Sequence, residues 1–112
     1  MTVLVTGCAG FIGHAVCQAL LADSEHKTVI GIDNLNDYYS VQLKRDRLSQ
    51  LTQHQQFSFH PLDITHEDAL KALFEQQQIN CVIHLAAQAG VRYSIENPQS
   101  YLQSNLLGFG HI

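Results

Sequence analysis

Proline is scarce in this 112-residue sequence, with two residues, and seven glycines are too few for a collagen-like or linker-like chain. No apolar run approaches the length of about 18 residues that a membrane span requires. The N-terminus has no basic segment followed by an apolar one, because the short apolar run after Met1 reaches Gly7 almost at once. We therefore expect a globular protein with no membrane partner.

Cysteine and positive charge are also limited. The three cysteines are an odd number without C-x-x-C spacing, which argues against a disulfide framework and a zinc site and favours a reducing, cytoplasmic environment. The seven histidines contain no H-x-x-x-H pattern, so no metal is expected. The net charge of −4 argues against a nucleic-acid partner. An anionic ligand would have to be bound by backbone dipoles rather than by bulk charge.

Short apolar segments alternate with segments of helical pattern. Runs rich in β-branched residues predict strands buried on both faces of a parallel sheet. Connections of this length predict right-handed crossovers between such strands. The sequence therefore predicts one α/β domain over residues 1–112, a Rossmann-type, doubly wound, three-layer α/β/α fold with about four strands in the order 3-2-1-4. The expected strands are 3–5, 28–32, 57–59 and 81–85.

Helices are expected between these strands and after the last one. The second helix has Asn36 or Asp37 as its cap. Thr65-x-x-Asp68 resembles a capping box at the start of the third, and Asn97-Pro98 is typical of the start of a fourth. Apolar side chains at helical spacing predict the faces that pack on the sheet. These are Ile12, Val16, Ala19 and Leu20 in the first helix and Val41, Leu48 and Leu51 in the second.

Gly7, Gly10 and Gly13 form a G-x-x-G-x-x-G pattern between the first strand and the first helix. The first glycine allows a tight turn, the second lets the backbone approach a pyrophosphate, and the third lets the helix pack closely. A pyrophosphate would rest on the N–H groups that begin this helix, where Phe11 and Ile12 lie. The pattern predicts dinucleotide binding, with a turn that only permits close packing as the alternative.

Asp33 follows Gly13 by about twenty residues and ends the second strand, where a carboxylate accepts hydrogen bonds from adenosine ribose hydroxyls. Its charge would repel a 2′-phosphate, and the glycine loop contains no Lys or Arg to attract one. The expected cofactor is therefore NAD rather than NADP. The alternative for Asp33 is a helix-cap or turn residue.

Further cofactor contacts are expected after the third and fourth strands. Asp63 would accept a hydrogen bond from the adenine amine and Ile64 would lie against the ring, although Asp63 alone fits an ordinary turn equally well. The segment Leu85-Ala86-Ala87 contains small residues where the backbone would pass close to the cofactor. Tight packing between strand and helix explains that segment equally well.

The glycine loop and the residues that follow the strands together resemble the NAD-dependent epimerase/dehydratase family of extended short-chain dehydrogenase/reductases, whose members act on nucleotide sugars. The resemblance extends to about Phe109, and within the family it is greatest to UDP-glucuronate 4-epimerases. It implies that Asn34 and Asn105 belong to the NAD site and that the substrate is a nucleotide sugar. Arg92, near the nicotinamide end, could meet a substrate carboxylate or phosphate, with a surface role as the alternative. The resembling segments are 6–13, 31–39, 63–64, 84–94 and 97–105.

The resemblance also implies a mechanism. In this family a tyrosine held by a lysine takes the proton of the sugar 4-hydroxyl while NAD accepts the hydride, and the 4-keto sugar turns over and takes the hydride back. None of the four tyrosines here is followed by lysine four residues later. We therefore expect no catalytic residue and no isomerase activity within these 112 residues, and interpret them as the N-terminal NAD-binding part of an epimerase. Alternatives are a stand-alone NAD-binding module and part of a nucleotide-sugar 4,6-dehydratase.

Other polar residues have ordinary interpretations. His84 is expected to be a hydrogen-bonded strand residue, and Cys8 a small loop residue rather than a nucleophile. The basic run of Lys44, Arg45 and Arg47 is expected on a solvated helix face. A homo-oligomer is expected, because the fourth strand would be an apolar sheet edge if no further strand covered it.

Overall fold

The computed structural model describes residues 1–22, 27–35 and 41–86. In these residues four parallel strands form one sheet in the order β3-β2-β1-β4. The predicted α/β class and strand order are confirmed. The strands are β1 (Thr2–Thr6), β2 (Thr28–Asp33), β3 (Phe57–Pro61) and β4 (Cys81–His84), and the helices are α1 (Phe11–Ala22), α2 (Val41–Leu51) and α3 (Glu67–Gln76).

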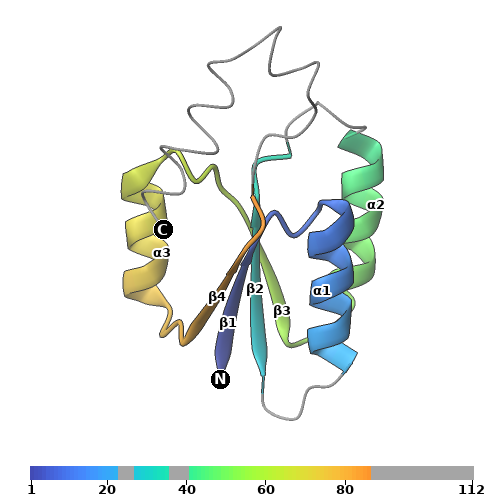
Figure 1. The fold of residues 1–112 in the computed structure, drawn as a ribbon, viewed down its shortest axis with the longest axis horizontal. Coiled ribbons are helices and arrows are strands. Elements are labelled where there is room, and N and C mark those ends of the chain that lie inside the picture. The colour runs from blue at the N-terminus through green and yellow to red at the C-terminus, as the bar shows by residue number, and fades with distance from the viewer. Residues whose placement is uncertain (23–26, 36–40, 87–112) are drawn as a thin grey trace, which may run out of the picture.

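The sheet lies between two helical layers (Figure 1). Helices α1 and α2 cover one face, and α3 covers the other. Alternate side chains of a strand point to opposite faces, so each face receives its own set of core residues. Val3 and Val5 of β1 pack on the α1/α2 side, whereas Leu4 packs on the α3 side. This burial of both faces explains the continuous apolar character of β1.

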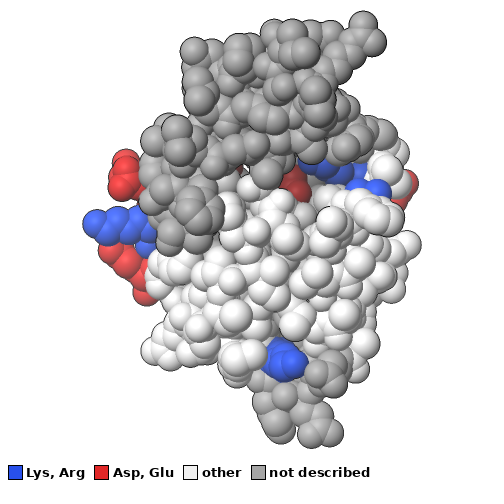
Figure 2. All heavy atoms as spheres, viewed as in Figure 1, with Lys and Arg blue, Asp and Glu red and all other residues white. Residues whose placement is uncertain are grey.

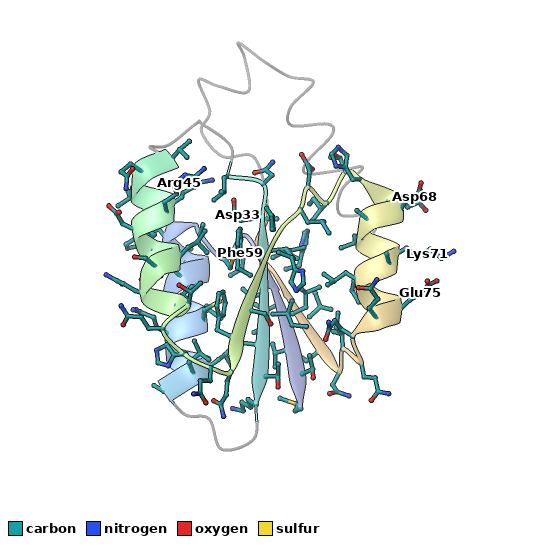
Figure 3. The ribbon with its side chains drawn as sticks, turned by 180° about the vertical axis from the view of Figure 1, so that it is seen from behind. Asp33, Arg45, Phe59, Asp68, Lys71 and Glu75 are labelled. Atoms are coloured by element: carbon teal, nitrogen blue, oxygen red, sulfur yellow. The ribbon has the colours of Figure 1, made fainter. Side chains whose placement is uncertain are left out.

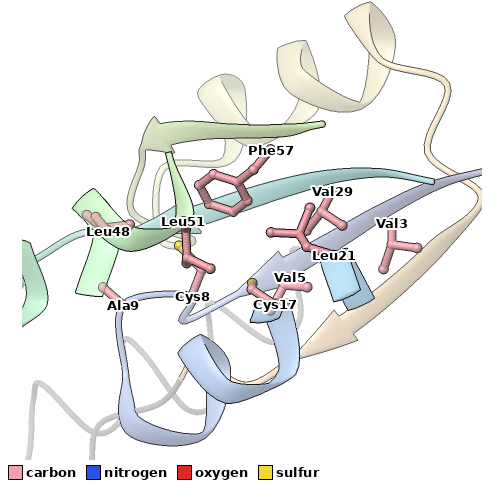
Figure 4. Packing of buried hydrophobic residues seen from close by; sticks show 10 residues of the cluster. All are labelled: Val3, Val5, Cys8, Ala9, Cys17, Leu21, Val29, Leu48, Leu51 and Phe57. Carbon is pink, nitrogen blue, oxygen red and sulfur yellow. The ribbon is translucent and has the colours of Figure 1, made fainter. Parts of the chain in front are cut away.

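The core on the α1/α2 side joins residues of β1, β2 and β3 to residues of α1 and α2 (Figure 4). Cys8, which follows β1, and Cys17 of α1 are both fully buried in it. A Cβ atom at Gly31 of β2 would lie 2.7 Å from the Cys8 sulfur and 2.8 Å from Cζ of Phe57. A glycine at position 31 therefore leaves the space that these two side chains occupy.

Helix α1 buries a different face from the predicted one. Gly13, Cys17 and Leu21 are buried, whereas Ile12 is 62% exposed. Ala19 is exposed as well, and the other two predicted residues are only partly buried. The buried face is therefore shifted by about one residue from the predicted face. The reason is that small residues at 13 and 17 let the helix approach the preceding loop and the sheet. The apolar pattern alone gave no weight to Gly13.

The starts of the other helices also differ from expectation. The capping box at Thr65 is not formed, since His66 is the N-cap of α3 and no side-chain capping bond is present there. The Thr65 hydroxyl instead donates to Oδ1 of Asp63 at 2.7 Å. In α2, Leu48 and Leu51 are buried as predicted. The predicted caps Asn36, Asp37 and Asn97-Pro98 lie outside the described residues.

None of the helices in the described part of the chain is long and apolar enough to cross a membrane.

Candidate functional site

Strand register brings the carboxyl ends of the four strands to one edge of the sheet. Thr6 of β1 is paired with Ile32 of β2 and with His84 of β4, and Asp33 is paired with Pro61 of β3. The segments that follow the strands therefore start side by side. Ligands of doubly wound folds bind at this edge. It contains the predicted residues Gly7, Asp33, Asn34, Asp63, Leu85 and Ala86.

Gly7 makes the sharp turn out of β1. Its φ of 71° lies in the left-handed region, where side chains with a Cβ atom are strained. A Cβ atom here would also lie 3.0 Å from the Leu85 carbonyl group and from the Ala86 nitrogen. The segment after β4 thus packs tightly against the turn that follows β1, whereas the alternative for residues 85 and 86 was packing between strand and helix. Their contact with a cofactor stays a prediction.

Gly13 packs against the loop backbone rather than against the sheet. A Cβ atom on Gly13 would collide with the carbonyl oxygen of Gly7 and lie 3.1 Å from Cα of Cys8. A Cβ atom on Gly10 would lie 3.2 Å from that same oxygen, and, its chain neighbours apart, no other heavy atom of the described residues lies within 4 Å of it. The third glycine is therefore required by packing, whereas the second is under a much weaker steric constraint from the protein itself.

The amides of residues 7–10 all have acceptors within the protein. The first intrahelical bond of α1 runs from the His14 N–H to the Gly10 carbonyl at 2.9 Å, and an α-helix leaves its first amides without intrahelical acceptors. The geometry therefore fits an anion bound by the amides of residues 11–13 rather than by the loop. The loop acceptors are the Ile32 carbonyl for Gly7 and Cys8 (2.9 and 3.2 Å), Asp33 for Ala9 (3.1 Å) and the Gly7 carbonyl for Gly10 (3.0 Å).

Asp33 lies at the end of β2, near α2 (Figure 3), and is only 7% exposed. Its Oδ2 accepts the Ala9 N–H at 3.1 Å, which ties the glycine loop to β2. Its Oδ1 accepts the Leu35 N–H at 2.7 Å, and Leu35 has a φ of 55°. The turn role that was the alternative for Asp33 is therefore observed, and a ribose contact stays a prediction.

The basic run on α2 was predicted to lie on a solvated helix face, and this prediction is wrong for two of its three residues. Lys44 is 8% exposed, and its Nζ lies 3.5 Å from Oδ1 of Asp33. Arg47 donates to the Ala9 carbonyl at 3.1 Å, and its guanidinium lies 5.9 Å from the centre of the Phe11 ring. Only Arg45 of this run is exposed. The missed signal was the spacing, since 44 and 47 fall on the same helical face as the buried Leu48 and Leu51.

Asp63 and Asn34 meet after β3 and β2. The Asn34 amide donates to Oδ2 of Asp63 at 3.3 Å, and Thr65 donates its amide and hydroxyl to Oδ1 at 2.9 and 2.7 Å. Partial burial alone would raise the pKa of Asp63, but these hydrogen bonds outweigh it and lower the pKa below its ordinary value. Asp63 is therefore ionised near neutral pH. Ile64 is 5% exposed and packs in the α3-side core, so a contact of its side chain with adenine stays a prediction.

Thr6 and His84 form a partly buried hydrogen-bonded cluster at the carboxyl ends of β1 and β4. The Thr6 hydroxyl accepts the N–H groups of Leu85 and Ala86 at 2.9 and 3.0 Å and lies 2.7 Å from Nδ1 of His84. With both lone pairs used, the hydroxyl donates its own proton to Nδ1, so His84 is neutral and protonated on Nε2. Burial lowers the pKa of His84, which is consistent with this state. His84 is a hydrogen-bonded strand residue, as the sequence predicted.

Because the pKa of His84 is lowered in the folded state, the unfolded chain binds a proton first as the pH falls below about 6.5. The free energy of unfolding should therefore decrease as the pH is lowered from 7.5 through the folded-state pKa. His84→Asn keeps an acceptor for Thr6 but cannot titrate, so urea unfolding at pH 7.5 and 5.5 should show a smaller difference than in the wild type. Gln53→Asn introduces the same side chain at an exposed position that does not titrate and should leave the wild-type difference unchanged. An undiminished pH dependence in His84→Asn would contradict this assignment.

The thiols near the loop are not nucleophiles. Burial, and then the charge of Asp33, raise the pKa of Cys8 far above its ordinary value, and burial raises the pKa of Cys17 to about 12. Both thiols are thus protonated at physiological pH. Within the described residues no group of three His, Cys, Asp or Glu side chains could hold a metal ion. The predicted site residues Ala87, Arg92 and Asn105 lie outside the described residues.

The chain is similar in sequence and structure to known nucleotide-sugar epimerases. The chain is 54% identical over 105 residues to a UDP-glucuronate 4-epimerase of Thermodesulfobacterium geofontis, covering 94% of this chain and 32% of that protein. It superposes with a TM-score of 0.87 and 38% identity on UDP-glucuronic acid 4-epimerase from Bacillus cereus, solved with UDP-glucuronic acid and NAD, covering 99% of this chain and 34% of that one.

A dehydratase is similar in structure at lower identity. The dTDP-glucose 4,6-dehydratase DesIV from Streptomyces venezuelae, solved with NAD and TYD, has a TM-score of 0.85 at 29% identity, over 99% of this chain and 34% of that one. The chain thus spans about a third of the length of these relatives. Residues 4–112 match the family described as GDP-mannose 4,6 dehydratase. This protein therefore belongs to the GDP-mannose 4,6 dehydratase family of nucleotide-sugar epimerases and dehydratases.

Proposed function

We propose that this chain binds NAD at the carboxyl edge of its sheet and forms the NAD-binding part of a UDP-glucuronate 4-epimerase. The observation that carries the proposal is the link from Asp33 to Ala9, which holds a buried carboxylate beside a loop whose own amides are already satisfied. The start of α1, which would bind an anion, and a carboxylate that would accept a ribose hydroxyl are therefore adjacent. Relatives that are solved with NAD support the choice of cofactor.

Each part of the cofactor would contact a different group of residues. The amides that begin α1, from Phe11 to Gly13, would hold the pyrophosphate, and Gly7 and Gly10 would keep the approach open. Asp33 would accept a ribose hydroxyl on Oδ2. The residues expected to complete the site are Asn34, Asp63 and Ile64 around the adenine, and Leu85, Ala86, Ala87 and Asn105 along the rest of the cofactor. When bound, NAD would supply the reversible hydride transfer that epimerisation at C4 requires.

The substrate assignment rests on the relatives. Among the superposed structures, identity to the UDP-glucuronic acid 4-epimerase is 38%, whereas identity to the dehydratase is 29%, which favours the epimerase. Arg92 remains the candidate for contact with the sugar nucleotide. The acid–base step would belong to the whole protein, because the 112 residues contain no Tyr-x-x-x-Lys. A cytoplasmic location and a homo-oligomer remain part of the proposal.

Calorimetric titration tests the cofactor assignment. The chain should bind NAD more tightly than NADP, and Asp33→Ala should weaken NAD binding by about 10- to 100-fold, the usual effect of losing a hydrogen bond to a charged group. Asp68→Ala, on the outer side of α3 (Figure 3), is the matched control and should leave both affinities unchanged. Equal affinity of the native chain for NAD and NADP would contradict the assignment.

The substrate is tested by product analysis. The whole protein with UDP-glucuronate and NAD should yield UDP-galacturonate, and the 112-residue chain alone should yield none. No reaction of the whole protein with UDP-glucuronate, together with conversion of a nucleotide hexose that carries a 6-hydroxyl group, such as dTDP-glucose, into its 4-keto-6-deoxy product with loss of water, would favour the dehydratase alternative. Conversion by the 112 residues alone would show that the acid–base groups lie elsewhere than expected.

A further inference from the structure

A buried ion pair lies at the point where the ribose of NAD is expected. Of the described lysines and arginines, Lys44 alone is buried, and the side chains of Lys44 and Asp33 are 9% and 6% exposed. Removing an ammonium group from water is unfavourable unless a partner balances its charge. Asp33 is the one partner that the described residues offer it within 4 Å. Each charge therefore depends on the other.

A second cation, Arg47 from the next turn of α2, contacts the glycine loop beside Asp33. Arg47 donates to the carbonyl of Ala9, the residue whose amide donates to Asp33. Figure 2 shows basic and acidic side chains side by side at the end of the molecule where Figure 1 places the start of α2, while the face below them is mainly white. Positive charge thus reaches the glycine loop from α2, although the loop itself contains none.

The carboxylate of Asp33 has little capacity left for a ligand. A carboxylate offers about four lone-pair sites. Leu35 and Lys44 lie on Oδ1 and Ala9 lies on Oδ2, so the described residues leave about one site, on Oδ2. That site can take one ribose hydroxyl. Because Lys44 balances the charge of Asp33, repulsion by Asp33 alone is too weak to explain why a 2′-phosphate would be rejected.

We propose that Lys44 is a specificity-determining residue, whose ammonium Asp33 masks, and that this masking sets the preference for NAD over NADP. The inference rests on the proposed NAD-binding function. A ribose oxygen bonded to Oδ2 of Asp33 would lie no more than about 8 Å from Nζ of Lys44, which is within the Debye length at physiological ionic strength. Removal of the carboxylate charge would leave Lys44 with no counter-ion among the described residues, and a 2′-phosphate would then supply one.

The decisive variant is Asp33→Asn, which keeps the shape and an acceptor oxygen but removes the charge. Calorimetry with NAD and NADP should show weaker NAD binding and NADP binding at least about tenfold tighter than in the native chain. The double variant Asp33→Asn with Lys44→Met should lose that gain. Lys71→Met, at an exposed position on α3, is the control and should change neither affinity.

A second set of variants keeps the native carboxylate and tests the proposal even if circular dichroism shows that Asp33→Asn is unfolded. Lys44→Met should raise the ratio of the NADP to the NAD dissociation constant by about tenfold, because Asp33 would then repel the 2′-phosphate unbalanced. Lys44→Arg keeps a cation and should restore the native ratio. A purely structural role of Lys44 would weaken both cofactors equally and leave the ratio unchanged.

The outcomes separate the two proposals. A native chain that binds NAD, with no gain in NADP affinity in a folded Asp33→Asn or with a gain that persists in the double variant, would overturn the role of Lys44 alone. An unchanged ratio in Lys44→Met would do the same. A native chain that binds neither cofactor would overturn the proposed function, and this inference with it.

Discussion

Replacement of Gly13 by alanine should destabilise the chain by about 3 kcal/mol or more and abolish NAD binding. The added Cβ would collide with the Gly7 carbonyl oxygen and lie 2.8 Å from the Gly7 carbonyl carbon, and none of these backbone atoms can rotate aside. Overpacking of this kind costs about 1–3 kcal/mol and more where backbone must move. Because α1 would be pushed away from the loop, the amides of residues 11–13 would also be displaced. Urea unfolding followed by circular dichroism measures the loss.

Gly10→Ala is the matched control. The same methyl group would there lie 3.2 Å from one atom, the Gly7 carbonyl oxygen, so the cost in stability should stay within about 1 kcal/mol. NAD binding should nevertheless weaken, because the methyl group would occupy the approach to the pyrophosphate. Equal stability losses in the two variants would show that Gly13 is not the packing glycine.

Replacement of Thr6 by valine should cost about 3 kcal/mol with almost no change of shape. The Ala86 N–H and Nδ1 of His84 would lose these hydrogen bonds in a partly buried place, and each buried polar group left unsatisfied costs about 1–3 kcal/mol. The Leu85 N–H would keep only its longer bond to the Thr6 carbonyl, at 3.3 Å. The free energy of unfolding in urea is the measurement. The segment that leaves β4 should also become less protected against amide hydrogen exchange.

Two controls isolate the hydroxyl of Thr6. Thr6→Ser keeps the hydroxyl and loses one methyl group, so it should cost about 1 kcal/mol. Thr52→Val removes an exposed hydroxyl and should change stability by less than about 0.5 kcal/mol. If Thr6→Val were no less stable than Thr6→Ser, the hydrogen bonds of this cluster would contribute nothing to the fold.

The features that the sequence predicted correctly follow from strong local patterns. Continuous β-branched runs and their separation determine the strands, and the strand order then brings Gly7, Asp33 and Asp63 to one edge. The requirement for glycine at position 7 follows from a backbone angle that other residues avoid. None of these inferences needed knowledge of which side chains touch.

The features that could not be predicted depend on contacts between distant segments. A basic run on a helix is normally solvated, and the burial of Lys44 became visible only when Asp33, eleven residues earlier, was placed beside it. The buried face of α1 depends on how closely Gly13 approaches Gly7. Thr65 could serve either as a helix cap or as a donor to Asp63, and geometry favoured the latter.

The most direct test of the account is an NMR titration of amide resonances with NAD. The amides of Phe11 and Ile12 should show the largest shifts, followed by those around Asp33, while the amides along α3 from Glu67 to Gln76 should stay unchanged. Such a result would place the pyrophosphate at the start of α1. Shifts centred on α3, or none at a saturating NAD concentration, would contradict the claim that this edge of the sheet is a dinucleotide site.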